Sequence, residues 1–268
     1  MKTGSKRWIC LIGIVLLFAL FALLWYWDCI DKDTFDGSKP DFNMYVITLR
    51  HDDRMKNIQE QQQKTAKEIR IFDAVKGDAL DLDQLVRDGV ITQDGSFGTH
   101  APKRVVGCAM SHLNLYEKIA SDYRQNPHIK YTIIFEDDFV ILSDTFDSDV
   151  VSILQKVEEN ARNTDIIYLG MLNDTSDKYH YRDNIYHIDT DDMAIGTHAY
   201  IVNNERMADM INHFRPINDA SDWVLTHLLQ KKNIHGMVVS PVMVVQGSEL
   251  QSTVSNVGRE TFRAIHRS

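Results

Sequence analysis

Residues 131–138 read YTIIFEDD, a near-continuous apolar run that ends in three adjacent carboxylates. Such a run is typical of a strand buried on both faces of a sheet. Ligands of open α/β sheets bind beyond the carboxyl ends of the strands, so the place of Glu136, Asp137 and Asp138 matters more than their composition. Adjacent carboxylates repel one another unless a cation compensates them, and their hard oxygens suit Mn²⁺ or Mg²⁺, which also hold nucleotide phosphates. The alternative interpretation is a solvated acidic turn with one carboxylate capping a helix.

Strand-like and helix-like segments alternate on both sides of this run. Short β-branched and apolar runs predict strands, and the charged or amphipathic stretches between them predict helices. The predicted strands are 44–49, 69–75, 131–135, 165–169, 196–202 and 237–245, and the predicted helices are 52–69, 108–123, 150–162, 205–214 and 223–229. Residues 76–104 are predicted to form a loop region on the substrate side. The alternation indicates an α/β fold with a mostly parallel central sheet.

The chain begins with a long apolar stretch. Residues 8–27, WICLIGIVLLFALFALLWYW, carry no charge and are long enough for a helix of about 30 Å, the thickness of the hydrocarbon core of a bilayer. Aromatic residues stand at both ends, basic residues precede the run and acidic residues follow it. This pattern predicts one N-terminal transmembrane helix of a single-pass type II protein, with the large domain in an ER or Golgi lumen if the source is eukaryotic or viral. The alternative, a cleaved signal peptide, fits less well because bulky residues follow the run.

Composition limits the class of protein. A chain of 268 residues with 44% hydrophobic residues is too long and too apolar for a disordered tail. The net charge is −9, and the acidic excess lies outside the N-terminal segment, which argues against nucleic acid as a partner. The three cysteines cannot build a disulfide framework or a four-thiolate zinc site. The predicted parts are a cytosolic tail (1–7), the transmembrane helix (8–27), a polar stalk (28–43), one main domain (44–258) and a basic C-terminal tail (259–268).

Further polar residues gather around the predicted helix before the acidic strand. Lys103 and Arg104 precede the phrase GCAMSH (107–112), at a place where cations can meet a diphosphate. Cys108 is interpreted as a small packed residue rather than a nucleophile. For His112 two interpretations stay open, a ligand and a hydrogen-bonded structural histidine.

Two late segments offer candidate residues as well. Gly196 permits close approach of a ligand, or it only makes a turn. Asp222 begins an amphipathic helix, and on local sequence Ser221 or Asp222 is interpreted as its N-cap. Asn173 starts an N-glycosylation sequon, which has meaning only in a eukaryotic secretory pathway.

Taken in order, six segments resemble glycosyltransferase family 25, the group of lipopolysaccharide-type galactosyltransferases and collagen β-galactosyltransferase-like proteins. They are YVITLRHDDR (45–54), GCAMSHLNLYEK (107–118), IIFEDDF (133–139), GTHAYIV (196–202), SDW (221–223) and VVSP (238–241). The resemblance covers nearly the whole main domain. It implies a GT-A-like nucleotide-sugar-binding domain, a UDP-sugar donor, most often UDP-galactose, a Mn²⁺ (or Mg²⁺) cofactor and an inverting displacement.

The resemblance also implies roles for individual residues. Asp138 and Glu136 are the expected metal ligands, and Asp222 is the expected general base. Expected donor or nucleotide contacts are Arg54, Lys103, Arg104, Ser111, His112, Glu136, Asp137, Gly196 and Thr197. One departure concerns the late histidine that many GT-A enzymes add to the metal site, because Gln246 stands in that segment and His235 precedes it.

Together these observations predict a membrane-anchored enzyme that moves a hexose from a UDP-sugar to a hydroxyl of a glycan or glycoprotein. A metal ion would offset the charge that builds on the leaving diphosphate, and a base would take the acceptor proton. Two alternatives remain at this point. One is a catalytically silent sugar- or protein-binding domain with the same fold, and the other is a nucleotidyltransferase that releases pyrophosphate.

Overall fold

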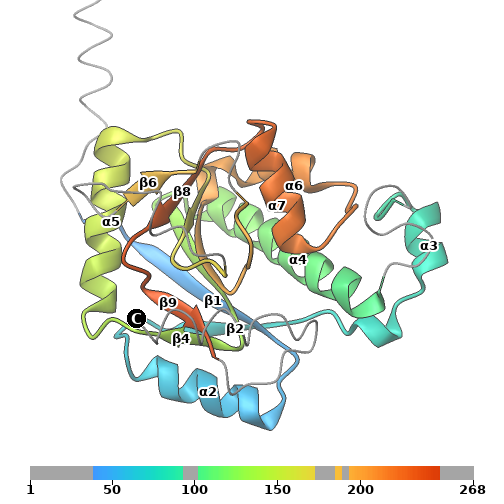
Figure 1. Cartoon of the computed structure of the whole chain (residues 1–268), viewed down its shortest axis with the longest axis horizontal. Helices are drawn as coiled ribbons and strands as arrows, with labels where there is room; N and C mark the ends of the chain where they lie inside the picture. Colours follow the sequence, from blue (N-terminus) through green and yellow to red (C-terminus); the bar gives the residue numbers. More distant parts are fainter. Residues whose placement is uncertain (1–38, 93–101, 173–184, 189–192, 248–268) are drawn as a thin grey trace, which may run out of the picture. The chain divides into compact units, whose positions relative to one another are not determined.

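The computed structural model describes residues 39–92, 102–172, 185–188 and 193–247. All of them except Lys39 belong to the compact unit Pro40–Ser268. Within these residues, seven strands form one sheet in the order β2-β1-β3-β7-β5-β8-β6 (Figure 1). Their bounds are β1 Phe42–Thr48, β2 Ile69–Asp73, β3 Tyr131–Glu136, β5 Ile166–Tyr168, β6 Ile185–His187, β7 Ala199–Asn203 and β8 Gly236–Val239. Two short strands, β4 Phe139–Ile141 and β9 Val244–Gln246, pair with each other.

The helices of the described residues connect these strands. They are α2 Asp52–Gln62, α3 Leu82–Arg87, α4 Lys103–Gln125, α5 Phe146–Asn160, α6 Met207–Phe214 and α7 Ser221–Gln230, with short 3-10 turns η1 Gly77–Ala79 and η3 Asn204–Arg206. The order therefore opens as β-α-β and continues with helices between strands. This confirms the predicted α/β fold.

The sheet is mixed, which corrects the prediction of a mostly parallel sheet. Strand β1 runs parallel to β2 and β3, and β5 runs parallel to β8. In contrast, β7 is antiparallel to both β3 and β5, and β6 is antiparallel to β8. The spacing of apolar residues cannot reveal this, because both strand directions show the same period of two. The reversal places the start of β7 beside the end of β3, where the Glu136 amide donates to the His198 carbonyl oxygen at 3.0 Å.

Helices cover both faces of the sheet (Figure 1). Helices α4, α6 and α7 pack on one face, and α2 and α5 pack on the other. Strand β3 contributes alternate residues to the two cores: Ile134 packs with α4, and Ile133 and Phe135 pack with α5. All three side chains are fully buried. This confirms the prediction that the run YTIIF is buried on both faces.

Several element boundaries differ from the sequence-based ones for local reasons. Helix α2 ends at Gln62 rather than at residue 69, because Thr65 and the Ala66 amide turn away to bond the carboxylate of Asp147. Helix α4 begins at Lys103, directly after Pro102, whose fixed φ suits a helix start. The predicted strand 237–245 divides into β8 and β9 around Pro241, which has no amide hydrogen for a ladder.

The predicted membrane anchor is also corrected. In the part of the chain that the structure describes, no helix has the length and apolar character needed to span a bilayer. Residues 8–27, on which the transmembrane helix and the single-pass type II arrangement with a lumenal domain were predicted, lie outside that part. The structure therefore provides no helix that supports the predicted topology and localisation.

Candidate active site

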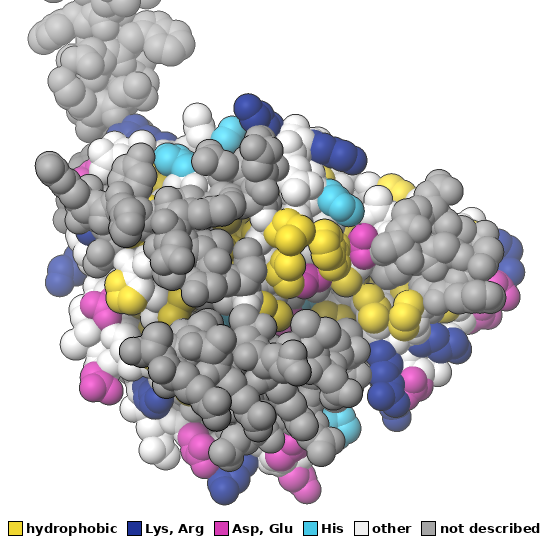
Figure 2. All heavy atoms as spheres, viewed as in Figure 1, with side chains coloured by type: hydrophobic (Ala, Val, Ile, Leu, Met, Phe, Trp, Pro, Cys, Tyr) yellow, Lys and Arg dark blue, Asp and Glu magenta, His cyan; other side chains and the backbone are white. Residues whose placement is uncertain are grey.

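A cavity of about 450 Å³ opens at the carboxyl ends of β1 and β3. Its walls come from these strand ends, the first half of α4, the segment before β7 and the start of α7. Figure 2 shows hydrophobic and acidic side chains close together near the middle of one face of the molecule. All predicted site residues except Lys103 line the cavity. Segments that are far apart in the sequence thus converge at the sheet edge where the acidic motif was predicted to act.

Asp138 is the most buried carboxylate of the acidic motif, at 5% exposure. Its Oδ2 accepts a hydrogen bond from Gln246 Nε2 at 2.9 Å and lies 3.1 Å from Arg54 Nη1. Its Oδ1 is buried and has no hydrogen-bond partner among the described residues. Burial raises the pKa of Asp138, the charge of Glu136 raises it further, and Arg54 and Gln246 offset only part of this. A solvated acidic turn would not have these properties, so the local alternative does not hold for Asp138.

Arg54 joins helix α2 to the acidic motif. The side chain is 3% exposed, and Nη1 lies 3.3 Å from Asp137 Oδ1 and 3.1 Å from Asp138 Oδ2. The guanidinium thus supplies positive charge between two carboxylates. Arg54 lines the cavity as predicted for a nucleotide contact, but its observed pairing is with the acidic motif.

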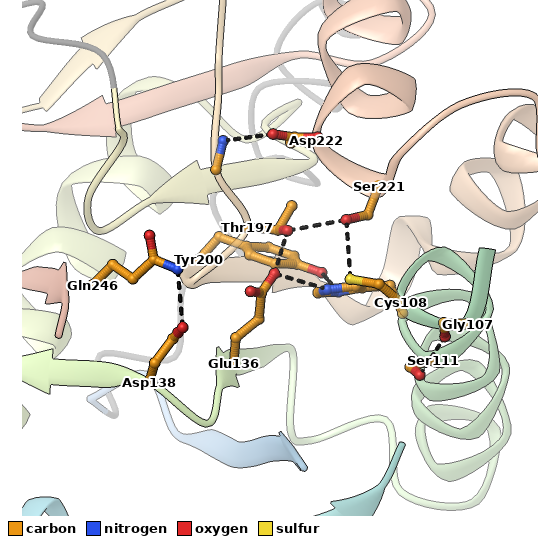
Figure 3. A network of polar contacts seen from close by, with 12 residues as sticks. Gly107, Cys108, Ser111, Glu136, Asp138, Thr197, Tyr200, Ser221, Asp222 and Gln246 are labelled. Carbon is orange, nitrogen blue, oxygen red and sulfur yellow. Dashed lines mark hydrogen bonds and ion pairs between the residues drawn. The ribbon is translucent and has the colours of Figure 1, made fainter. Parts of the chain in front are cut away.

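Glu136 anchors a polar network at the end of β3 (Figure 3). Its Oε1 accepts a hydrogen bond from the hydroxyl of Thr197 and lies 3.3 Å from His112 Nε2. The other ring nitrogen of His112, Nδ1, lies 2.7 Å from the hydroxyl oxygen of Tyr200. Burial alone would raise the pKa of Glu136, but the contacts with His112 and Thr197 outweigh it and lower the pKa. Glu136 is therefore held as a carboxylate with a fixed orientation.

Asp222 faces the cavity from the first turn of α7. Ala220, not Asp222, is the N-cap residue. The Asp222 carboxylate accepts hydrogen bonds from the amides of Gly196 at 3.2 Å and Trp223 at 2.9 Å. Gly196 has φ of +97°, a conformation that residues with a side chain rarely adopt, which explains a glycine here. Burial raises the pKa of Asp222 and the charge of Glu136 adds to this, while the hydrogen bonds offset part of the shift. A half-buried carboxylate with a raised pKa is suited to accept a proton.

The remaining predicted residues have more structural surroundings. The Ser111 hydroxyl donates to the Gly107 carbonyl at 2.6 Å and accepts from the Val75 amide at 2.8 Å, so it links α4 to the loop after β2. Arg104 lines the cavity and pairs with Asp78 at 3.5 Å. Lys103 lies outside the cavity lining, and its Nζ donates to the Leu80 carbonyl at 2.6 Å. The structure therefore does not bring Lys103 to the site.

His198 and Cys108 are among the cavity residues that were not nominated from sequence as contacts. His198 is buried, its Nε2 lies 3.3 Å from the Val244 carbonyl oxygen, and its Nδ1 has no hydrogen-bond partner in the described part of the chain. Burial lowers the pKa of His198, which keeps the ring neutral. Cys108 also lines the cavity, and burial, followed by the charge of Glu136, raises the pKa of its thiol well above the ordinary value. His198 was within a recognised phrase, but only the antiparallel pairing of β7 with β3 reveals its place beside the acidic motif.

The donor set at the strand end fits a hard divalent cation. The unpartnered Oδ1 of Asp138 is buried, and its raised pKa shows that positive charge would stabilise the carboxylate. Glu136 and Asp138 offer oxygen ligands of the kind that Mn²⁺ and Mg²⁺ prefer, and Gln246 holds the other carboxylate oxygen of Asp138, Oδ2. These residues can hold a cation. Asn173 of the predicted sequon and residues 248–268, which include the predicted basic tail, lie outside the described residues.

Comparisons with known proteins support an assignment at the level of family. The chain is similar to a glycosyltransferase involved in the glycosylation of the major capsid of PBCV-1, with 7% identity, a TM-score of 0.33, and coverage of 72% of this chain and 68% of that one. It is also similar to the glycosyltransferase GlyE of Streptococcus pneumoniae TIGR4, with 7% identity, a TM-score of 0.39, and coverage of 83% and 60%. Comparison with curated proteins finds no match. The protein-family model described as "Glycosyltransferase family 25 (LPS biosynthesis protein)" matches residues 42–225 of this chain. Since this match covers more than half of the chain and contains the acidic motif and Asp222, the protein belongs to glycosyltransferase family 25.

Proposed function

We propose that the protein transfers a hexose, with galactose as the first candidate, from a UDP-sugar to a hydroxyl group of a glycan or glycoprotein by metal-assisted inverting displacement. Membership of the family supports glycosyl transfer. The observation that carries the finer proposal is the buried Asp138, whose Oδ1 has no hydrogen-bond partner among the described residues and which lines the same cavity as Asp222. A cavity of about 450 Å³ falls within the usual range for small-molecule sites.

In this proposal the end of β3 binds the donor diphosphate. Asp138 and Glu136 would hold Mn²⁺ or Mg²⁺, which as a Lewis acid would supply positive charge to offset that of the departing UDP. Thr197 and His112 keep Glu136 ionised and oriented. Arg54 and Arg104, which line the same cavity, contribute positive charge near the phosphates.

Asp222 acts as the general base in this proposal. Inversion needs one group that removes the proton from the acceptor hydroxyl while its oxygen attacks the anomeric carbon opposite to UDP. Asp222 lies on α7, while the acidic motif lies at the end of β3. The backbone amides of Gly196 and Trp223 fix the direction of its carboxylate. The proton moves to a carboxylate oxygen whose pKa is already raised, which favours acceptance of the proton.

A screen of UDP-sugars on the full chain tests the proposal. We expect UDP release that requires Mn²⁺ or Mg²⁺ and increases with an acceptor, such as a hydroxylysine peptide or a lactose-type glycan. The Asp222→Asn variant should bind UDP as tightly as the unmodified chain does, but it should form UDP from the UDP-sugar far more slowly. Release of pyrophosphate instead of UDP would assign a nucleotidyltransferase. Unchanged release in Asp222→Asn would remove the base from Asp222.

A further inference from the structure

A thiol, an imidazole and a carboxylate meet on the α4 side of the cavity. Cys108 and His112 stand four residues apart on α4, and Glu136 ends β3. The Cys108 sulfur, a His112 ring nitrogen and a Glu136 carboxylate oxygen all lie within 4.8 Å of one another. Figure 3 shows the side chain of Cys108, from the helix, and that of Glu136, from the end of the strand, pointing toward each other. We refer to Cys108, His112 and Glu136 as the thiol cluster.

The spacing of the thiol cluster suits a tetrahedral cation. Zinc bonds nitrogen and oxygen at about 2.0 Å, so a tetrahedral site separates the two ligand atoms by about 3.3 Å. The separation of His112 Nε2 and Glu136 Oε1 is 3.3 Å. Zinc bonds sulfur at about 2.3 Å, which sets the sulfur-to-nitrogen separation at about 3.5 Å. The Cys108 sulfur lies within 4.8 Å of both atoms, so the three side chains can supply three ligands. All three residues line the cavity, from which a fourth ligand can enter.

Neighbouring hydroxyl groups fix the orientation of these ligands. His112 is fully buried, and its Nδ1 lies 2.7 Å from the Tyr200 hydroxyl, which in turn lies 2.7 Å from the hydroxyl of Tyr116. A histidine whose second nitrogen is hydrogen-bonded in this way presents the first nitrogen in a fixed direction, as metal-binding histidines do. The Thr197 hydroxyl donates to Glu136, and the Ser221 hydroxyl lies 3.7 Å from the Cys108 sulfur.

The thiol cluster differs in chemistry from the oxygen donors of Asp138. A thiolate with an imidazole selects borderline-soft cations such as Zn²⁺, whereas carboxylates alone suit Mn²⁺ and Mg²⁺. We propose that Cys108, His112 and Glu136 bind Zn²⁺ at a second cation site. Binding displaces the thiol proton, and the sulfur bonds the metal as a thiolate. Because Glu136 belongs to both sites, Zn²⁺ bound to the thiol cluster inhibits sugar transfer and does not substitute for Mn²⁺. This consequence rests on the proposed function, but the binding of Zn²⁺ itself does not.

Metal binding to the full chain, without donor or acceptor, tests the proposal. Zn²⁺ affinity is measured by competition with a chromophoric chelator, and Co²⁺ serves as a probe whose thiolate-to-metal absorption band reports a sulfur ligand. We expect one Zn²⁺ per chain and a thiolate band with Co²⁺. Cys108→Ser should abolish the band and weaken Zn²⁺ binding by at least about 100-fold. Its melting temperature shows whether the variant is folded.

Two further variants keep the test decisive. Cys29→Ser is the matched control, because it also removes one thiol but not one of the thiol cluster. It should leave the Co²⁺ absorption band and the Zn²⁺ affinity unchanged. Tyr200→Phe should keep the band yet weaken Zn²⁺ binding about 10- to 100-fold, because His112 loses its orienting partner. A band that survives Cys108→Ser, or one that disappears in Cys29→Ser, would overturn the proposal. Zinc binding without sugar transfer would contradict only the proposed function, so the two failures are distinguishable.

Discussion

Replacing Arg54 by methionine tests how the acidic motif is stabilised without a metal. Arg54 is 3% exposed and contacts both Asp137 and Asp138. Methionine has a similar length but no charge, so the buried Asp138 and the partly buried Asp137 would lose their cation. Removing one partner of a buried ion pair costs about 3–5 kcal/mol of folding stability. The matched control is Lys118→Met, because Lys118 pairs with Asp122 on the surface of α4 and such exposed pairs contribute about 0.3–0.5 kcal/mol.

Urea unfolding of the two variants measures these losses. The loss in Arg54→Met should shrink as the pH falls, because the pKa of Asp138 is raised in the folded chain and removal of Arg54 raises it further. A raised carboxyl pKa means that the folded state binds more protons, so acid stabilises the variant relative to the unmodified chain. Mn²⁺ should restore more stability in Arg54→Met than in Lys118→Met, since it replaces the lost charge. A loss below about 1 kcal/mol that is independent of pH and Mn²⁺ would refute this reasoning.

Two other expectations follow from the structure. If Asp222 is the base, Asp222→Asn lowers the turnover number by about 10²- to 10⁴-fold. The activity of the unmodified chain should then fall in acid at a pH above 3.8, the ordinary pKa of aspartate, because the base must be ionised and its pKa is raised. A rate that stays constant down to about pH 4 would contradict this assignment. Gly170→Ala places a methyl group 1.9 Å from the Val244 carbonyl oxygen and 2.9 Å from His198 Nε2. The free energy of unfolding should therefore fall by about 1–3 kcal/mol. An unchanged urea midpoint would show that the backbone at Gly170 packs less closely against Val244 than the structure indicates.

Local patterns were sufficient to predict most elements of the fold. The buried strand β3, the opening β1-α2-β2 and the long helix α4 follow from the length and period of apolar residues. The direction of β7 could not be predicted, because it depends on which strands pair with it rather than on its own sequence. The short strand β6 was also missed, since three residues show too little periodicity. The mixed sheet is the consequence of these two non-local features.

The candidate site shows the same division. The position of Glu136 and Asp138 after an apolar strand was enough to predict a polar site at that sheet edge, and both residues line one cavity together with Asp222. The pairing of Arg54 with two carboxylates was not predictable, because it depends on how α2 packs beside the end of β3. Lys103 was expected near the phosphates, but its ammonium group reaches the Leu80 carbonyl instead. Single charged residues carry no pattern that distinguishes these outcomes.

The most direct test of the central claim is calorimetric titration of UDP into the full chain, with and without Mn²⁺, for the unmodified protein and Asp138→Asn. The claim is that the side chains at the end of β3 hold a divalent cation for the donor diphosphate. It predicts that Mn²⁺ tightens UDP binding at least about tenfold in the unmodified chain and has little effect in Asp138→Asn. Equal UDP affinity in both proteins, with Mn²⁺ present, would contradict it.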